Sequence, residues 1–203
     1  MFLTRVELTN VRCIRSLTLP LEMRSGVTRK WTLLLGDNGV GKSTLMRSIG
    51  LVLAGSSALA ELIGDPGSWV HAGEQQCTIS ADLETADGDK RHISLQISRG
   101  DTIKDVYERN KDTLEMLDRA IDRVSRNYLV IAYGASRRLS STKLSTQTAA
   151  SRFRHPRANN VATLFSPDAM LNPLETWAID LHYRRQEEGS PSSTRRCAGC
   201  CPA

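Results

Sequence analysis

The stretch that decides the fold is Trp31–Thr44, which reads WTLLLGDNGVGKST. Residues 31–35 form a short continuous apolar run, which is typical of a strand covered on both faces. Residues 36–43 then fit the pattern G-x-x-x-x-G-K-[ST] without a mismatch. The apolar side chains that follow recur on one helical face, and Gly55 is predicted to end that helix. These side chains are Leu45, Ile49, Val52 and Leu53. The order is therefore strand, glycine loop, helix, which is the context that this pattern requires.

The residue types of the loop suit a ligand that carries phosphate groups. Glycines reach backbone angles closed to other residues and let main-chain amides turn inward around an anion, at which the following helix also points its first amides. We expect Lys42 to act as a point charge for the β- and γ-phosphates, the Ser43 hydroxyl to ligate Mg²⁺, and Thr44 to lie near the α-phosphate. ATP and Mg²⁺ are thus the predicted ligands. The predicted loop contacts are Gly36, Asp37, Asn38, Gly39, Val40, Gly41, Lys42, Ser43 and Thr44.

Length and composition exclude several classes of protein. The chain has 203 residues, of which 40% are hydrophobic and 24% charged, so it is a globular mixture rather than a wholly disordered one. No stretch approaches the ~18 apolar residues of a membrane-spanning helix, and the first residues do not have the pattern of a signal peptide. The five cysteines do not form an evenly spread disulfide framework. We expect a soluble cytoplasmic protein with no membrane partner.

Periodicity predicts the remaining elements. Alternating apolar residues predict strands over 2–8 and 16–22, the latter at a sheet edge because Pro20 lacks an amide donor. Residues 77–84 and 92–98 flank ADGD, which predicts a β-hairpin. Residues 105–126 and part of 168–184 read as helical, and 128–133 (YLVIAY) as another buried strand. Residues 56–73 and the acid-free stretch 134–167 read as mainly loop.

Several motifs resemble a known family. GDNGVGKST resembles the phosphate loop of ABC-type P-loop ATPases of the RecF/SMC group, and Asn10-Val11-Arg12 resembles the turn that precedes it there. In this family a loop at the end of a later strand senses the γ-phosphate. Tyr133–Arg137 (YGASR), which follows the strand-like run 128–133, resembles that loop as it occurs in bacterial AAA-type ATPases of the RecF/OLD-like group. The resemblance makes Asn10 and Arg12 candidates for nucleotide contact, and Ser136 and Arg137 candidates for sensing the γ-phosphate. The alternatives are that Asn10 and Arg12 only complete a turn between strands, and that 134–137 is a surface turn.

The resemblance implies an α/β fold: a P-loop NTPase core of the ABC/SMC head type with an antiparallel side sheet. Two family elements are absent, namely an acid after an apolar strand and the LSxG(Q/E) signature; Asp82 and Asp180 follow unsuitable segments. In the family both elements belong to a C-terminal lobe, which we therefore expect this chain to lack. Residues 1–133 would form an ATP-binding lobe, 134–185 a basic loop and the start of a helical lobe, and 186–203 an irregular tail. Truncation and a natural half with a second chain both explain this organisation.

The implied function is that of the N-terminal lobe of a RecF/SMC-like ATPase, coupled to DNA handling, repair or defence against mobile DNA. A second copy, or a partner chain carrying the C-terminal lobe, would complete the site, and hydrolysis by this chain alone is not expected. The alternative is a non-catalytic interaction module that binds ATP and a partner. The basic stretch Arg137–Arg157 is the candidate DNA contact. Cys197, Cys200 and Cys201 have the spacing of half a structural zinc site, which needs four ligands, and we predict no zinc there.

Overall fold

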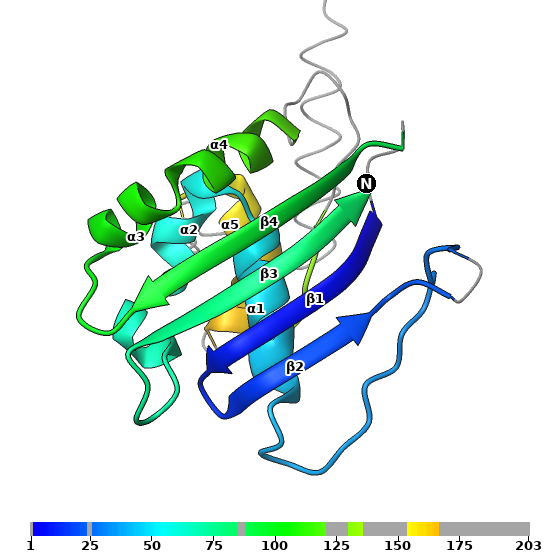
Figure 1. Cartoon of the computed structure of the whole chain (residues 1–203), viewed down its shortest axis with the longest axis horizontal. Coiled ribbons are helices and arrows are strands. Elements are labelled where there is room, and N and C mark those ends of the chain that lie inside the picture. Colours follow the sequence, from blue (N-terminus) through cyan, green and yellow to red (C-terminus); the bar gives the residue numbers. More distant parts are fainter. Residues whose placement is uncertain (1, 24–25, 85–87, 121–129, 136–153, 167–203) are drawn as a thin grey trace, which may run out of the picture.

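The computed structural model describes residues 2–23, 26–84, 88–120, 130–135 and 154–166. The chain order of the elements is β1 (Phe2–Val11), β2 (Ile14–Pro20), α1 (Lys42–Leu53), α2 (Ser56–Ile63), the short 3-10 helix η1 (Pro66–Trp69), β3 (Gln76–Glu84), β4 (Lys90–Ser98), α3 (Ile103–Arg109), α4 (Lys111–Ala120) and α5 (Pro156–Phe165). In the described residues, one helix-covered sheet organises the fold (Figure 1).

The sheet is antiparallel throughout, with the strand order β2-β1-β3-β4. β2 occupies an edge, as Pro20 predicted, and β3 and β4 form the predicted hairpin. Alternate residues of each strand face the helices. In β1 these include Val6 and Leu8, each 1% exposed, and Val11 is buried as well, beyond Asn10, where the backbone leaves the regular strand conformation. The mixed α/β class with an antiparallel sheet is therefore confirmed for the described residues.

The helices cover one face of this sheet and leave the other face open (Figure 1). The core contains apolar side chains from the strands together with helical side chains such as Leu51, Leu59 and Leu117. The open face carries polar residues at the facing register positions Glu7, Ser80 and Ser94. One buried and one solvated face explain the alternation that predicted these strands. No helix of the described residues is long and apolar enough to cross a membrane.

Both predicted buried strands are wrong in the described residues. Residues 31–37 have no helix, strand, turn or bend, and most side chains of the apolar run 31–35 are exposed. Residues 130–133, the described part of the second run, are also irregular. There the Ala132 amide donates to the Asn160 carbonyl of α5 at 3.0 Å instead of to a strand. A strand needs a neighbour with which to pair, and apolar composition does not supply one.

Two loop predictions and one helix prediction also need correction. The expected loop 56–73 contains α2, which buries Ala58, Leu59, Leu62 and Ile63. The expected loop 134–167 contains α5, which begins after His155, with Pro156 in its first turn. The predicted helix 105–126 is divided at Asn110, because the Asn110 side chain bonds to both backbone groups of Gln96, at 2.7 and 2.8 Å. Residues 121–126 and the predicted helix within 168–184 lie outside the described residues.

Candidate phosphate-binding site

The glycine loop lies between the irregular stretch 31–37 and helix α1. Gly39 and Gly41 have φ of 88° and 102°, values that L side chains rarely adopt. A Cβ atom on Gly41 would also lie 3.0 Å from Cγ1 of Ile14 and 3.2 Å from Sγ of Cys13. The loop therefore requires glycine at position 41 for two reasons: its backbone angle and the close approach of the β1–β2 turn.

The first turn of α1 suits an anion. The helix begins at Lys42, after Gly41, and has neither a side-chain cap nor an acidic residue in its first turn. The Leu45 amide is bonded to the Gly41 carbonyl at 2.9 Å, so the amides of residues 42–44 precede the helical hydrogen bonds. Such amides, together with the helix dipole, favour a negative charge at this end of the helix.

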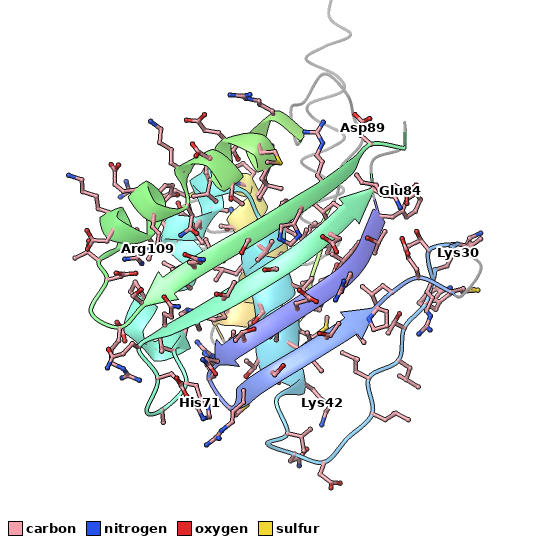
Figure 2. All side chains as sticks on the ribbon, in the orientation of Figure 1. Lys30, Lys42, His71, Glu84, Asp89 and Arg109 are labelled. Carbon is pink, nitrogen blue, oxygen red and sulfur yellow. The ribbon has the colours of Figure 1, made fainter. Side chains whose placement is uncertain are left out.

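Lys42 is held inside the loop by backbone carbonyls. Its Nζ atom donates to the carbonyl oxygens of Gly36 and Asp37, at 2.5 and 2.6 Å. An ammonium group has three N–H donors, so one donor remains for an anion above the loop. In Figure 2, Lys42 lies at the end of α1 nearest the β1–β2 turn.

The other predicted loop residues are mostly open to solvent. Asp37, Asn38, Val40 and Ser43 are exposed, whereas Thr44 is half-buried. Thr44 Oγ1 lies 3.9 Å from Cys13 Sγ. Among the described residues, no group of three or more His, Cys, Asp or Glu side chains could hold a metal ion.

The β1–β2 turn brings Asn10 and Arg12 to the same end of α1. Both residues have positive φ, 56° and 52°. The Asn10 carbonyl accepts from the His71 amide at 2.8 Å, and the Arg12 amide donates to Trp69 O at 2.8 Å. His71 Nδ1 also donates to the Arg12 carbonyl. These bonds join the turn to residues 69–71, so the backbones of Asn10 and Arg12 do complete a turn, whatever their side chains contact.

The Arg12 guanidinium lies over the Trp69 ring, with Cζ 4.2 Å from the ring centroid. Its Nε atom is buried and has no hydrogen-bond partner. Burial and the nearby charge of Arg47 lower the Arg12 pKa from its ordinary value. The structure thus places Arg12 between Trp69 and α1 rather than on the open surface. No local pattern indicates Trp69 as the partner of Arg12, because the two residues are distant in the chain.

Ser136 and Arg137 lie outside the described residues, but the residues that lead to them do not. The Gly134 amide donates to Thr163 Oγ1 of α5 at 3.2 Å, and a Cβ atom at Gly134 would lie 2.0 Å from the Thr163 carbonyl oxygen. Arg47 of α1 donates through Nε to the Leu164 carbonyl at 2.8 Å. Helix α5 therefore connects residues 130–134 to α1. Sequence reasoning missed this helix, although its buried positions recur at helical spacing.

The acid Asp82 lies far from the loop. It pairs in the sheet with Arg5, seven residues from Arg12 along β1, which corresponds to ~24 Å in a strand. Its Oδ1 atom accepts from His92 Nδ1 at 2.6 Å on the open face of the sheet. Asp82 therefore cannot serve as the acid of the loop. Asp180, the basic stretch 137–153 and the three C-terminal cysteines lie outside the described residues.

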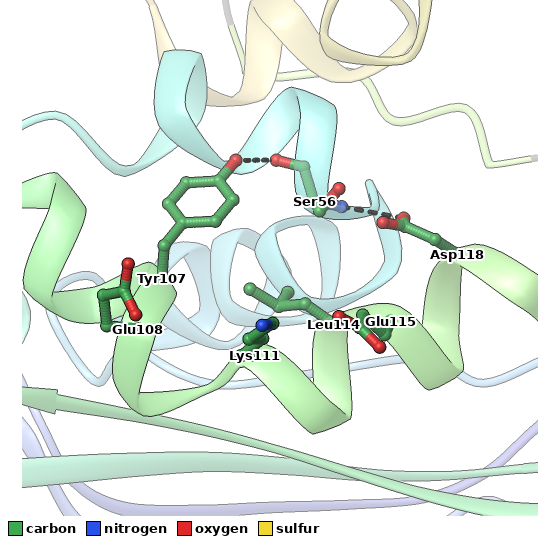
Figure 3. A pocket seen from close by; sticks show the side chains of 7 residues that line it. All are labelled: Ser56, Tyr107, Glu108, Lys111, Leu114, Glu115 and Asp118. Atoms are coloured by element: carbon green, nitrogen blue, oxygen red, sulfur yellow. Dashed lines mark hydrogen bonds between the residues drawn. The ribbon is translucent and has the colours of Figure 1, made fainter.

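A pocket of about 290 Å³ lies elsewhere, between α2 and the α3–α4 pair (Figure 3). It is lined by Ser56, Tyr107, Glu108, Lys111, Leu114, Glu115 and Asp118. Tyr107 donates to the Ser56 carbonyl, and the Ser56 amide donates to Asp118 Oδ1 at 3.1 Å. Ser56 follows the end of α1 opposite Lys42, and a 12-residue helix spans ~18 Å. The pocket is therefore separate from the phosphate loop.

Comparison with known proteins identifies the family. The family described as AAA domain matches residues 5–157, about three quarters of the chain. The chain therefore belongs to the AAA domain family. This membership confirms the expected kinship with AAA-type ATPases.

Two individual proteins are similar over shorter stretches. The Septu protein PtuA of Bacillus mycoides (strain KBAB4) is 32% identical over 62 residues, which are 30% of this chain and 9% of that protein. The match thus spans less than a tenth of the relative. A solved structure, described as the recombination mediator protein RecF-ATP in the RecFOR pathway, is 19% identical, with a TM-score of 0.36. That likeness covers 48% of this chain and 24% of the other, and supports no conclusion on its own.

Proposed function

We propose that this AAA-domain chain binds ATP together with Mg²⁺ at the loop Gly36–Thr44. The observation that supports this most directly is the position of Lys42. Two loop carbonyls hold its ammonium group beside the uncapped first turn of α1. The cation, the free helix amides and the open loop converge on one point, where a chain of phosphate groups would meet all three.

Each loop residue has a separate part in this proposal. The third N–H of Lys42 reaches the β- and γ-phosphates, and the loop amides from Asp37 to Gly41 surround them. The Ser43 hydroxyl, which is exposed, is the proposed Mg²⁺ ligand, and Thr44 lies nearest the α-phosphate. When bound, Mg²⁺ neutralises charge on the phosphate oxygens.

Four residues outside the loop are proposed as further contacts. Asn10 and Arg12 belong to the turn that touches Gly41 and Thr44 through Cys13. Arg12 would have to move from Trp69 to reach a phosphate with its guanidinium group, whereas its charge acts on the loop from its present position. Ser136 and Arg137 follow a segment that α5 joins to α1, and they remain proposals as sensors of the γ-phosphate.

Hydrolysis needs a carboxylate that activates water, and Asp82 is too far from the loop to provide it. We propose that this acid comes from outside the described residues, from a second copy or a partner chain. ATP binding would then be coupled to DNA handling, repair or defence against mobile DNA, with Arg137–Arg157 as the DNA contact. A non-catalytic module that binds ATP and a partner is the second candidate, and the position of Asp82 favours it.

Titration calorimetry with ATP and Mg²⁺ tests the proposal. Wild-type protein is expected to bind, and Lys42→Ala to weaken binding by about a hundredfold, because it removes the charge that faces the phosphates. Lys104→Ala, which removes an exposed lysine of α3, is the matched control. Equal affinity in all three proteins would disprove the assignment of the site.

Production of ADP from labelled ATP, measured over a range of protein concentrations, separates the two candidates. Turnover that disappears in Lys42→Ala and rises more steeply than protein concentration indicates that a second copy completes the site. Binding without turnover at any concentration favours the non-catalytic module. We expect high salt to abolish DNA binding, because DNA contacts release counterions. We do not expect high salt to abolish ATP binding.

A further inference from the structure

The pocket between α2 and the α3–α4 pair takes no part in the proposed ATP site (Figure 3). Its volume of about 290 Å³ is at the lower end of the range for ligand pockets, so it suits a group of the size of one side chain. The pocket lies beyond the end of α1 opposite Lys42. A ligand in the pocket would therefore not compete with a phosphate group at the glycine loop.

Two side chains give the pocket an apolar wall. Leu114 of α4 is 6% exposed, and Tyr107 of α3 is half-buried. The Tyr107 hydroxyl already donates to the Ser56 carbonyl of α2, which holds the side chain in place. Tyr107 therefore offers a ligand its aromatic ring, whose faces carry partial negative charge.

The charged side chains that line the pocket are mostly acidic. The carboxylates of Glu108, Glu115 and Asp118 stand against a single cation, the ammonium group of Lys111, which leaves two negative charges in excess. The Ser56 amide donates to Oδ1 of Asp118 at 3.1 Å and holds this carboxylate at the first turn of α2 (Figure 3).

Other cations of the described residues do not neutralise this excess. Glu108 and Asp118 form no ion pair with a described residue. Glu115 lies 3.5 Å from Arg119 on an exposed helix surface, where an ion pair is weak. Burial raises the pKa of Tyr107, and the negative charge of Asp118 raises it further. The carboxylate charge of Asp118 thus acts on the aromatic wall of the pocket.

An aromatic ring, an apolar wall and an excess of carboxylates together favour an organic cation. A guanidinium group stacks on aromatic rings, forms paired hydrogen bonds with carboxylates and is weakly hydrated. A metal ion is not favoured, because no group of three or more His, Cys, Asp or Glu side chains in the described part of the chain could hold one. An anion would be repelled by the excess negative charge.

We propose that this pocket binds a guanidinium group on a short alkyl stem, with the stem against Leu114 and the cation near the Tyr107 ring, Glu108 and Asp118. The group belongs either to a free small molecule or to an arginine side chain of a partner polypeptide. The site needs no nucleotide, so it can fail or succeed independently of the proposed ATP site. Because the pocket is open to solvent, we expect a dissociation constant of about 1 mM.

Titration of the isotope-labelled full chain with propylguanidinium, followed by nuclear magnetic resonance, is the first test. Without nucleotide and at constant ionic strength, the amide signals of Ser56 and of residues 107–118 are expected to shift. Propylurea has a similar shape but no charge, and it is expected to bind at least about tenfold more weakly. Equal binding of the two compounds, or no shift up to about 20 mM propylguanidinium, would overturn the proposal.

Two exposed charges of the pocket predict opposite effects on the same titration. Glu108→Gln is expected to weaken binding by about fivefold, and Lys111→Gln to strengthen it by about threefold, because the two substitutions remove charges of opposite sign. Glu74→Gln removes an exposed acid outside the pocket and is the matched control, with wild-type affinity expected. Changes of the same sign in both pocket variants, or no change in either, would contradict the assigned charges.

The aromatic wall is tested by two substitutions of one residue. Tyr107→Phe keeps the ring and is expected to bind propylguanidinium like the wild type, whereas Tyr107→Leu is expected to bind it about threefold more weakly. Both variants lose the hydrogen bond to Ser56, so the comparison isolates the ring. Equal affinity of the two variants would overturn the role of the ring.

A capped tripeptide, acetyl-Gly-Arg-Gly-amide, distinguishes the two sources of the group. Binding as tight as that of propylguanidinium supports an arginine side chain of a partner polypeptide. Binding at least about tenfold weaker supports a free small molecule, because the pocket then excludes the peptide backbone. Failure of both compounds to bind would overturn the site itself.

Discussion

Leu8 and Leu33 are the same type of residue, and each belongs to an apolar stretch, but their environments are opposite. Leu8 lies on β1, paired in register with Leu17 of β2 and Ile79 of β3, and is 1% exposed. Leu33 lies in a run at least as apolar, yet it is 80% exposed. The difference is the presence of neighbouring strands. β1 has one on each side and helices over one face, whereas residues 31–35 have no strand beside them among the described residues.

This contrast shows that an apolar composition favours burial but does not by itself supply the neighbours that bury the segment. Only one antiparallel partner of β1 is supplied by a short local turn, namely β2, which follows at once; the other, β3, pairs Val6 with Ala81 and is distant in the chain. A strand of the parallel, doubly covered kind needs partners from distant parts of the chain or from another chain. Residues 130–133 repeat the lesson, because there a helix, α5, provides the backbone partner.

The largest expected effect sharpens this contrast directly. Leu8→Ala removes a side chain from the centre of the core and is expected to lower the free energy of unfolding by about 2–5 kcal/mol. Leu33→Ala is expected to change it by less than about 0.5 kcal/mol, because the side chain is already in solvent. Urea unfolding of both variants at low protein concentration measures the two values. Similar losses in both variants would show that residues 31–35 are buried in solution.

A smaller effect is expected where the glycine loop meets the sheet. Gly41→Ala forces a non-glycine residue to φ near 102° and brings its Cβ to 3.0 Å from Ile14, so we expect a loss of about 2 kcal/mol. Gly39→Ala meets nothing within 4 Å and suffers only from its φ of 88°, for an expected loss of about 1 kcal/mol. Thermal unfolding compares the pair. Equal losses would mean that Ile14 and Cys13 can move away from the added Cβ without lowering the stability of the fold.

The smallest expected effect concerns charge. Asp101 accepts hydrogen bonds from Arg109 and from the Ser98 amide, which lower its pKa from the ordinary 3.8. A lowered carboxyl pKa stabilises the fold above about pH 4, and this stabilisation is lost as the pH falls through the folded-state value. Asp101→Asn is therefore expected to cost about 0.5–1 kcal/mol at pH 7 and less at pH 3.

Asp37→Asn is the matched variant for this last prediction, because Asp37 has no ion-pair partner among the described residues. Thermal unfolding between pH 7 and pH 3, at low protein concentration, compares the two variants. A pH-independent loss in Asp101→Asn would show that the carboxylate contributes by its shape rather than by its charge.

Local patterns predicted the elements whose partners are near in sequence. The β1–β2 and β3–β4 pairs, the ADGD turn and Pro20 at an edge describe contacts made within a few tens of residues, whereas the alternation of β1 and β3 was readable although their pairing joins residues as distant as Val6 and Ala81. The loop Gly36–Ser43 and the start of α1 at Lys42 were also predictable, because glycine and lysine at fixed spacing have a local geometrical meaning. The roles assigned to Asn10, Arg12, Ser136 and Arg137 remain predictions.

Other features depend on distant residues and were not predictable from local pattern. Asn110 divides one periodic stretch into α3 and α4 because it bonds to Gln96 of β4. α5 forms on a stretch that reads as loop, because its apolar side chains find the core and Glu61 accepts from the His155 amide. The stacking of Arg12 on Trp69 joins residues more than fifty positions apart.

The sequence by itself determined that this chain has a phosphate loop, an antiparallel sheet with one apolar face, and apolar segments whose burial requires neighbouring elements. Those properties follow from residue type and spacing, which act over a few residues. Only the tertiary structure decided which segments are covered. It buried β1, placed α5 against α1 and left Trp31, Leu33 and Leu35 in solvent. The physical reason is that burial and backbone pairing are satisfied by neighbours in space, and these depend on the path of the whole chain.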